Sequence, residues 1–345
     1  MTPRLEISFP YQMQRQFLFG EPYSPAPNEF LLNHARSGIM LALQAMHLPQ
    51  GSGVGVMAYN CHTVMNAVSQ AGMKPVFIDV TDNLQIDMAD LHDKMPQMKV
   101  LVLTHLFGIE NDVRQIKELY PNLPVIEDCA HAYGKTNKVG DFIVFSIGQG
   151  KLPSLGDGGI LRVQNEYYLQ KVKDLYVHLP QYSKWQSAKL FIRLCLKSFL
   201  YRPLIYRSLT LPLKRNAAPP SAIVSIKPHQ MNQGVWAMYA TERNTVEDKI
   251  AVRLQHAEKL REQLLQLSDV KRAWYGENAF MMIVETDNPI KLQQKLLKKS
   301  IDSATHFSHS IGWAKDFGYT DGDCANAERL MYKLLMIPTY KNIDL

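Results

Sequence analysis

The chain of 345 residues contains few cysteines, and none of them stands close to another in the sequence. They are Cys61, Cys129, Cys195 and Cys324. Because no Cys-x-x-Cys pair is present, we expect no metal site and no disulfide framework, and the spacing suits the reducing cytoplasm. No uninterrupted apolar stretch reaches the ~18 residues of a membrane-spanning helix. With 46% hydrophobic residues, the chain can bury a large core in one or two domains.

Acidic residues are absent from positions 175–241, whereas basic residues recur there among apolar and aromatic ones. The basic residues of positions 184–215 are Lys184, Lys189, Arg193, Lys197, Arg202, Arg207, Lys214 and Arg215. Residues 189–200 combine an apolar helical face with a basic rim. Such a helix can lie on an anionic membrane surface, pack onto the protein with its cationic heads in solvent, or bind a phosphate-rich substrate. No known nucleic-acid-reading motif organises these charges, so we expect no nucleic acid partner.

Short apolar runs alternate with amphipathic segments over the first half of the chain. Strands are expected at residues 54–58, 75–79, 100–104, 125–126 and 142–145, and helices at 33–47, 63–71, 89–95 and 113–120. This alternation of β-branched runs with helices predicts a mostly parallel sheet with helices on both faces. Ligands of such sheets bind beyond the carboxyl ends of the strands. Four polar residues fall at such ends: Asp79, His105, Asp128 and Ser146.

The pattern changes in the later part of the chain. A long helical pattern covers residues 231–267, and an apolar strand is expected at 280–284. We therefore predict an α/β fold with a large domain over residues 1–230 and a smaller C-terminal α+β domain over residues 231–345. Residues 1–30, rich in proline and aromatics, are expected to wrap a surface or a partner subunit.

Lys151 follows an apolar strand and precedes the run Gly-Asp-Gly-Gly at 156–159. A lysine held among glycines at a strand end can be desolvated and kept neutral enough to attack a carbonyl. Asp128, at the end of a neighbouring strand, can hold a pyridinium nitrogen protonated. Taken alone, Lys151 would be interpreted as a solvated surface residue, and Asp128 as a cap of the following helix. Together they supply what pyridoxal phosphate (PLP) needs, a lysine for its aldehyde and an acid for its ring nitrogen.

Four segments carry a family resemblance, and they occur in one order along the chain. They are Ser37-Gly38, the run 125–131 (Val-Ile-Glu-Asp-Cys-Ala-His), Phe145-Ser146 followed by Lys151 and 156–159, and residues 324–338, expected as a helix and a Leu-Pro turn. With these segments, the chain resembles the DegT/StrS-type aminotransferases. These are PLP enzymes of the aspartate aminotransferase fold (fold type I), and most of them aminate nucleotide-linked keto-sugars. The resemblance runs from about residue 33 to the end and is weakest over the divergent residues 165–228.

The resemblance implies a role for three residues at the cofactor ring. Lys151 would form the Schiff base with PLP and then move a proton as general base and acid. Asp128 would pair with the ring nitrogen, and His131 would lie near the phenolic oxygen. Some relatives have histidine at the lysine position and catalyse dehydration, so Lys151 argues against that branch.

The resemblance also implies a phosphate site. Backbone N–H groups at Ser37 and Gly38, with the helix dipole, would hold the PLP phosphate, and Ser146 would add a contact. Ile39 replaces the family's threonine, so one hydroxyl contact is lost. Pro228 stands where the family's Gly-x-Asn-x-Arg motif, which reaches the partner's phosphate, has asparagine; Lys227 is the candidate replacement.

The identity of the residue that stacks on the cofactor ring stays open. Cys61 falls at the position where the family has an aromatic ring. Either Tyr59 or His62 could supply a ring by a shift of the backbone, or Cys61 packs against the cofactor as a small apolar group. His306, Phe307 and His309 occupy a segment that in relatives approaches the active site, although histidines near a turn are more often solvated.

The leading hypothesis is a cytoplasmic PLP-dependent aminotransferase that moves an amino group from an amino acid to a nucleotide-linked keto-sugar in polysaccharide or secondary-metabolite biosynthesis. The resemblance implies a homodimer with the active site at the subunit interface, where residues 1–30 and the loop around Lys227 come from the partner. The alternative is a PLP-binding, catalytically weak protein with a scaffold or membrane-docking role in polysaccharide assembly. Residues 184–215 are expected to be helical and to form an acceptor-binding or membrane-facing side, away from the cofactor.

Overall fold

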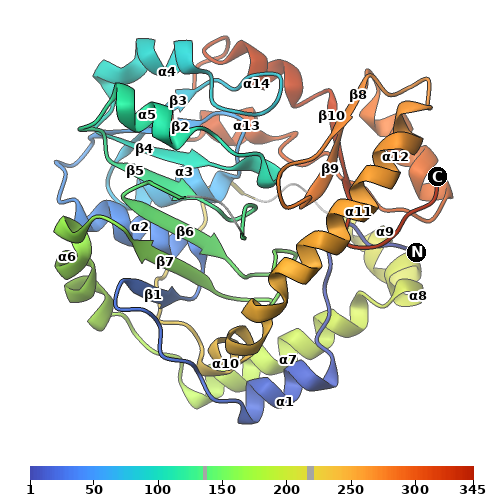
Figure 1. Ribbon diagram of the computed structural model, residues 1–345, viewed down its shortest axis with the longest axis horizontal. Coiled ribbons are helices and arrows are strands. Elements are labelled where there is room, and N and C mark those ends of the chain that lie inside the picture. Colours follow the sequence, from blue (N-terminus) through green and yellow to red (C-terminus); the bar gives the residue numbers. More distant parts are fainter. Residues whose placement is uncertain (135–137, 216–220) are drawn as a thin grey trace.

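The computed structural model describes residues 1–134, 138–215 and 221–345, and residues 216–220 of the basic segment lie outside this range. Seven strands of the described residues form one sheet, in the order β1-β7-β6-β5-β4-β2-β3 (Figure 1). Their bounds are β1 (Glu29–Leu32), β2 (Gly53–Met57), β3 (Lys74–Ile78), β4 (Val100–Thr104), β5 (Val125–Asp128), β6 (Phe142–Ser146) and β7 (Gly159–Val163). The pairs among β2 to β6 are parallel, which confirms the predicted sheet. The antiparallel strands β1 and β7 were not predicted.

Helices cover the sheet on both faces, as its apolar strands predicted. Those before residue 231 are α1 (Tyr11–Phe19), α2 (Ala35–Ala45), α3 (His62–Gln70), α4 (Met88–Lys94), α5 (Val113–Leu119), α6 (Glu166–Val177), α7 (Lys184–Leu200), α8 (Pro203–Ile205) and α9 (Leu211–Arg215). Strand β6 shows the alternation of sides. Phe142 and Val144 belong to the apolar cluster that includes α2, whereas Ile143 and Phe145 belong to the cluster formed with α1, α7 and α10 (Gln233–Glu242).

The C-terminal part contains a second, antiparallel sheet in the order β10-β9-β8, formed by described residues alone. Its strands are β8 (Arg272–Trp274), β9 (Met281–Glu285) and β10 (Leu334–Pro338), and the helices of this part are α11 (Val246–Leu265), α12 (Pro289–Lys298), α13 (Ser310–Lys315) and α14 (Ala325–Leu330). Leu260 of α11 and Leu296 of α12 pack on this sheet. The expected C-terminal helix is present as α14. The Leu-Pro turn is wrong, because the apolar run ending at Pro338 pairs with β9 as strand β10.

The domain boundary at residues 230 and 231 stays a prediction. Helix α10 lies after that boundary, yet its Val235 and Met238 pack in the same cluster as Phe145 of the large sheet. Residues 1–30 wrap their own chain in part: Phe17 of α1 lies against Phe191 of α7, with ring centroids 5.4 Å apart. Helices α1 and α7 therefore lie side by side (Figure 1).

Residues 184–215 are helical, as predicted, through α7, α8, a π-helical turn at Tyr206–Thr210 and α9. Leu190 and Leu194 are the buried residues of α7. Among the described residues, no helix combines the length and the apolarity that crossing a bilayer requires.

Candidate active site

A cavity of about 530 Å³ opens at the carboxyl ends of β4, β5 and β6, beside the start of α2. Thr104, Asp128 and Ser146, the last residues of these three strands, line it. The lining is completed by the loop 148–158, by α7, and by residues 280–281 and 306–307 of the C-terminal part. Glycine brings β7 against α2 here, since a Cβ on Gly159 would lie 2.2 Å from the carbonyl carbon of His34. The cavity therefore occupies the place expected for a ligand in a parallel sheet.

Five of the residues that the sequence assigned to the site line this cavity. They are Cys61, Asp128, His131, Ser146 and Lys151. Ser37 and Gly38 do not. The hydroxyl of Ser37 donates to Asn33 Oδ1 at 2.8 Å, and a Cβ on Gly38 would lie 3.3 Å from Val144 Cγ1. Their backbone N–H groups remain the predicted phosphate contacts.

The amine of Lys151 stands in the cavity without a hydrogen-bond or ion-pair partner among the described residues, and Nζ lies 5.7 Å from the centroid of the Phe280 ring. Burial lowers the pKa of Lys151, and the negative charges of Cys61 and Asp128 offset only part of that effect. A desolvated lysine with a lowered pKa is a better nucleophile at neutral pH than a solvated one. The geometry thus agrees with the chemistry that the sequence predicted for Lys151.

A chain of hydrogen bonds fixes Asp128. Its Oδ1 accepts from the backbone N–H of Ala130 at 3.0 Å, and its Oδ2 accepts from the hydroxyl of Thr104 at 3.2 Å. Thr104 in turn accepts from the side-chain amide of Asn60 at 2.9 Å. Burial raises the pKa of Asp128. Sequence reasoning missed Thr104 and Asn60, although both are polar residues that follow or end an apolar strand.

His131 lies in a stack of aromatic rings. Its centroid is 5.3 Å from that of Phe107 and 4.6 Å from that of Phe280. Its Nδ1 accepts from the backbone N–H of Phe107 at 3.2 Å, which assigns the ring proton to Nε2. Burial, with the charge of Lys151, holds the pKa of His131 well below its usual value. The ring is therefore neutral, and Nε2–H is its hydrogen-bond donor.

Neither Tyr59 nor His62 lines the cavity. The buried Tyr59 donates its hydroxyl to the carbonyl oxygen of His306 at 2.8 Å, and the ring of His62 packs on Trp313. Cys61 alone of the three lines it, and its Sγ lies 3.1 Å from the hydroxyl oxygen of Thr63. The two proposed ring shifts are therefore wrong, and the interpretation of Cys61 as a small packing group stays open.

Aromatic rings reach the cavity from the C-terminal part instead. Phe280, His306 and Phe307 line it, whereas His309 lies at the start of α13 against Trp313. Burial, with the charges of Arg4 and Lys151, lowers the pKa of His306 to about 3. The hypothesis that this segment approaches the site is confirmed for His306 and Phe307. No sequence signal pointed to Phe280.

Helix α7 also reaches the cavity. Arg193 and Lys197 line it, which agrees with an acceptor-binding side for the middle of residues 184–215. The expectation that this segment lies away from the cofactor stays a prediction. The approach depends on Gly156, which has a φ of +82° and on which a Cβ would lie 2.2 Å from Leu194 Cδ2. Burying the apolar face of α7 against this loop turns the basic rim toward the cavity.

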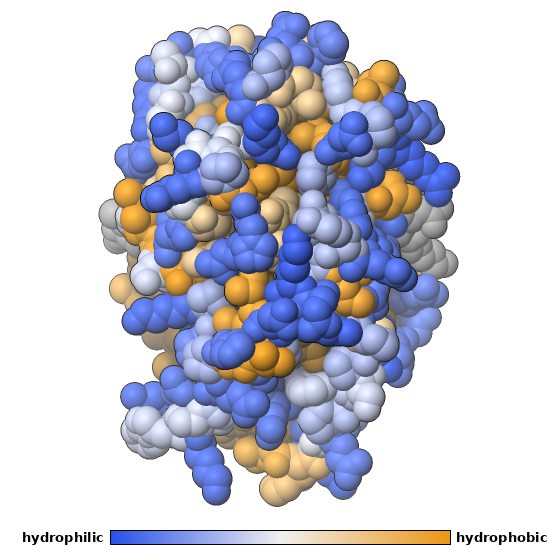
Figure 2. All heavy atoms as spheres, turned by 90° about the vertical axis from the view of Figure 1, so that its left-hand side faces the viewer, coloured by the Kyte–Doolittle hydropathy of each residue, from blue (hydrophilic) through white to orange (hydrophobic). Residues whose placement is uncertain are grey.

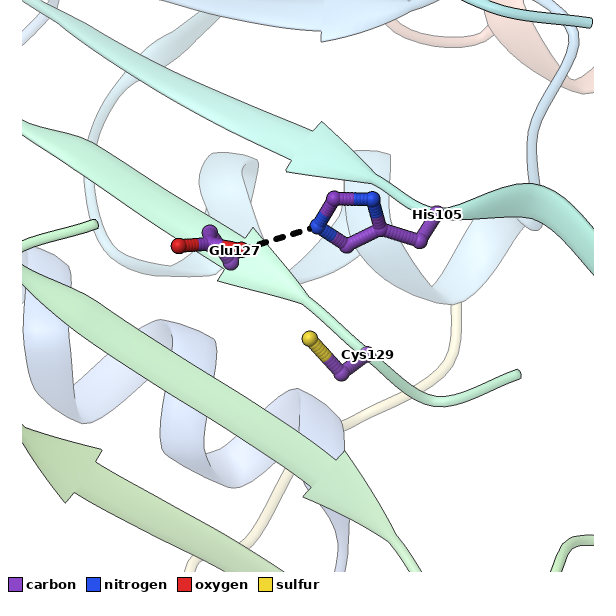
Figure 3. Close-up of side chains that lie close together, drawn as sticks. All are labelled: His105, Glu127 and Cys129. Carbon is purple, nitrogen blue, oxygen red and sulfur yellow. Dashed lines mark hydrogen bonds and ion pairs between the residues drawn. The ribbon is translucent and has the colours of Figure 1, made fainter. Parts of the chain in front are cut away.

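Two of the polar residues at strand ends serve the fold. The carboxylate of Asp79 accepts from the backbone N–H groups of Asn326 and Ala327 at 2.9 and 2.8 Å, at the start of α14. His105 lies beside Glu127 and Cys129, all three buried, with His105 Nε2 2.9 Å from Glu127 Oε2 (Figure 3). These groups include possible metal ligands, but hydrogen bonds already engage the histidine and the carboxylate.

The hydrogen bonds assign the protons of this buried pair. Nδ1 of His105 accepts from the backbone N–H of Asn111 at 3.1 Å, so Nε2 donates to Glu127. The second oxygen of Glu127 accepts from the backbone N–H groups of Val139 and Gly140 at 2.7 and 2.5 Å. Burial is the largest effect on the pKa of Glu127 and raises it, but the interactions with His105, Gly140 and Lys138 together outweigh burial and hold the pKa below its usual value. The pair ties β4 to β5 directly behind Asp128.

We expect His105→Leu to lower the free energy of unfolding by about 2–3 kcal/mol, because a buried carboxylate loses a donor. Urea denaturation at pH 7 measures the loss. The depressed pKa of Glu127 means that its contribution is present above the usual glutamate pKa and is lost as the pH falls through the folded-state pKa. His105→Leu combined with Glu127→Gln should cost less than the sum of the single changes. Additive losses would show that the two side chains do not interact.

Comparisons with known proteins agree with this geometry. A model of the DegT/DnrJ/EryC1/StrS aminotransferase family matches residues 27–190, a range that contains Ser37, Gly38, Cys61, Asp128, His131, Ser146 and Lys151. The uncharacterized protein MJ1066 of Methanocaldococcus jannaschii is 24% identical over 327 residues, which cover 90% of this chain and 80% of that protein. The GDP-perosamine synthase of Escherichia coli O157:H7 is 35% identical over 132 residues, which cover 35% of this chain and 36% of that enzyme.

The solved structures extend the likeness to the whole fold. Spr1654 from Streptococcus pneumoniae, in its PLP form, superposes with a TM-score of 0.74 at 13% identity, covering 99% of this chain and 94% of that one. This likeness confirms the predicted α/β fold with its second, smaller sheet. The family match includes the end of β5 with Asp128 and the loop after β6 with Lys151. Over residues 27–190, just under half of the chain, the sequence matches the model of the DegT/DnrJ/EryC1/StrS aminotransferase family.

Proposed function

We propose that this protein is a PLP-dependent aminotransferase that transfers an amino group from an amino acid to a keto-sugar. The observation that carries the proposal is one cavity that contains an unpartnered, desolvated lysine and a buried aspartate. The family match over residues 27–190 and the similarity to a GDP-perosamine synthase support a nucleotide-linked keto-sugar as acceptor. A polysaccharide or secondary-metabolite pathway is the setting in which such an amino sugar is used.

The residues present fit PLP, since Lys151 offers a free amine and Asp128 a fixed carboxyl group in the same cavity. When bound, PLP supplies an electron-withdrawing ring and an aldehyde for covalent attachment. Lys151 Nζ is proposed to hold the cofactor and, once free, to take a proton from the substrate carbon and return it. Its lowered pKa favours the neutral amine that this proton transfer requires. Phe280 and Phe307 exclude water from one side of the cavity.

The remaining residues orient the ligand. Asp128, fixed by Thr104, would hold the proton on the ring nitrogen, because a carboxylate stabilises a neighbouring cation. His131 Nε2–H would donate to an anionic oxygen of the ring. Ser146 lines the cavity at the end of β6 and would donate its hydroxyl to a phosphate oxygen.

Spectroscopy tests the proposed function. Purified protein that holds PLP is yellow, and an amino donor that is deaminated bleaches this colour. A series of amino acids, glutamate among them, is added to the loaded protein, and a keto acceptor should then restore the absorbance. A protein that binds PLP but keeps its colour with every donor would instead support the alternative, a catalytically weak scaffold.

A homodimer with the active site at the interface is the proposed assembly, on the strength of the family. The loop proposed as a partner contact also binds its own chain, because Asn33 donates from Nδ2 to the carbonyl oxygen of Lys227 at 2.9 Å. Sedimentation at micromolar concentration tests the dimer. A monomer that holds PLP tightly would contradict a shared site.

Helix α7 and the helices after it present an exposed apolar surface that supports peripheral membrane contact. Trp185, Leu196 and Leu204 are 68, 55 and 84% exposed. Figure 2 shows apolar atoms scattered between hydrophilic ones over one face, including a group at its lower end, the end at which α1 and α7 lie in Figure 1. Because residues 175–241 include no acid, this surface complements an anionic bilayer rather than a second copy of itself.

We expect the protein to co-sediment with phosphatidylglycerol vesicles at low salt and to be released at high salt. Each basic residue near such a surface contributes about 1 kcal/mol, and salt screens this attraction. Lys184→Glu with Lys189→Glu should weaken binding, whereas Lys291→Glu, on the exposed side of α12, is the matched control. No sedimentation at low salt would leave this surface without a lipid role.

A further inference from the structure

Three cations converge on the cavity from two helices. Arg36 comes from the first turn of α2, and Arg193 and Lys197 come from α7. The spacing of four residues places Arg193 and Lys197 on the same face of their helix. All three line the cavity that contains Lys151.

Arg36 lacks a partner. Its Nε is buried, and among the described residues no hydrogen bond or ion pair engages its guanidinium. Burial lowers the pKa of Arg36, although the charge of Asp157 acts in the opposite direction. Keeping a half-buried guanidinium without a partner costs free energy. An anionic group of a ligand would remove that cost.

The other two cations have incomplete partners. Arg193 Nη2 lies 3.6 Å from Asp157 Oδ2, but this carboxylate also accepts from Tyr182 at 3.1 Å and contacts His34 Nδ1 at 3.0 Å. Lys197 Nζ donates to the neutral side chain of Gln149. Burial, with the charge of Arg193, lowers the pKa of Lys197. A further anion would therefore find donors here that the carboxylates of the described residues satisfy only in part.

The charges of the cavity leave an excess that suits one phosphate. The described lining contains four Lys and Arg side chains, which are Arg36, Lys151, Arg193 and Lys197, and two carboxylates, Asp128 and Asp157. The cationic side chains therefore outnumber the carboxylates, even when the amine of Lys151 is neutral. A phosphate monoester carries about two negative charges at pH 7.

We propose that Arg36, Arg193 and Lys197 form a phosphate subsite that a single chain supplies. The subsite rests on the proposed function, and its phosphate belongs either to PLP or to a phosphorylated acceptor. Guanidinium groups bind phosphate through paired N–H donors, and an ammonium group adds a point charge. Helix α7 thus contributes to ligand binding in its own chain, at a site where Pro228 replaces the asparagine expected from a partner.

Binding titrations of three variants test the subsite. Arg36→Gln, Arg193→Gln and Lys197→Gln each remove one charge, and Lys189→Gln removes the same charge from the exposed side of α7 as the matched control. PLP and pyridoxal, which has no phosphate, are titrated by absorbance. If the subsite holds the cofactor phosphate, each of the three variants weakens PLP binding at least about tenfold and leaves pyridoxal binding unchanged.

Binding of inorganic pyrophosphate tests whether the phosphate in the subsite belongs to the acceptor rather than to PLP. If the subsite holds the acceptor, PLP binding stays as in the wild type, and calorimetry shows that the three variants of the PLP-loaded protein bind pyrophosphate more weakly. Unchanged pyridoxal binding shows in either case that the cavity is folded. Wild-type affinity of all three variants for PLP and for pyrophosphate would overturn the proposal, as would an equal loss in Lys189→Gln.

These outcomes are separate from those of the amino-transfer test. A wild-type protein that binds PLP through these cations but never bleaches with a donor would refute the aminotransferase and leave the subsite intact. A protein that transfers amino groups with unchanged binding in the three variants would refute the subsite alone.

Discussion

Lys151→Ala is expected to abolish covalent capture of PLP. Lys151 has the only free amine of the cavity among the described residues, because Lys197 donates to Gln149. Borohydride reduction of the loaded protein, followed by peptide mass spectrometry, should place the pyridoxyl adduct on Lys151 in the wild type and on no residue in the variant. Amino transfer should fall below detection, since removing a covalent catalytic group removes the step that it carries.

Lys151→Arg is the matched control for charge. Arginine keeps a cation in the cavity but cannot attack a carbonyl at neutral pH, so the adduct should again be absent. An adduct on Lys197 in either variant, with activity retained, would assign the role to helix α7 instead.

The pH dependence of capture follows from the lowered pKa of Lys151. The neutral amine reacts, so the rate of PLP capture by the apoprotein should rise with pH and level off below the pKa of a free lysine, about 10.4. Burial is the cause of the lowered pKa, and the charge of Asp128 raises it in part. Removing that charge should therefore move the plateau to still lower pH.

The central strands were predictable because each is a continuous apolar run between helices. Strands β1 and β7 were not, since they lie beside proline-rich or glycine-rich stretches that favour loops. Helix α1 was hidden between prolines for the same reason. Its position depends on Phe17, which packs against the distant Phe191.

The residues of the candidate site likewise include some that the sequence predicted and some that it did not. Asp128, Ser146 and Lys151 could be found because each follows or ends an apolar strand, and parallel strands end at one edge. Phe280 and Arg193 could not, because they reach the cavity only through packing of segments far apart in the chain. The direction of Tyr59 depends on the register at the end of β2, which composition does not determine.

Asp128→Asn is expected to lower the rate of amino transfer by about 10²–10³-fold, the range for the loss of one electrostatic contact in a closed site. Asparagine preserves the shape of the side chain and can keep the hydrogen bond from Ala130 through its amide oxygen, but its amide nitrogen cannot accept from Thr104. It cannot supply the negative charge that keeps a proton on the ring nitrogen. Single-turnover kinetics with an amino donor measure the effect, while the borohydride adduct on Lys151 should persist.

Thr104→Val tests whether the charge of Asp128 or the position of its carboxylate matters more. The change removes the hydroxyl that donates to Asp128 and leaves the carboxylate in place, so a smaller loss of about tenfold is expected. Burial raises the pKa of Asp128, and the hydrogen bond from Thr104 acts against it. The pKa of Asp128 should therefore rise further in Thr104→Val. As the pH is lowered, the variant should lose activity at a higher pH than the wild type does. If Asp128→Asn keeps wild-type turnover, Asp128 has no role at the ring nitrogen, and the buried carboxyl serves only to fix the end of β5.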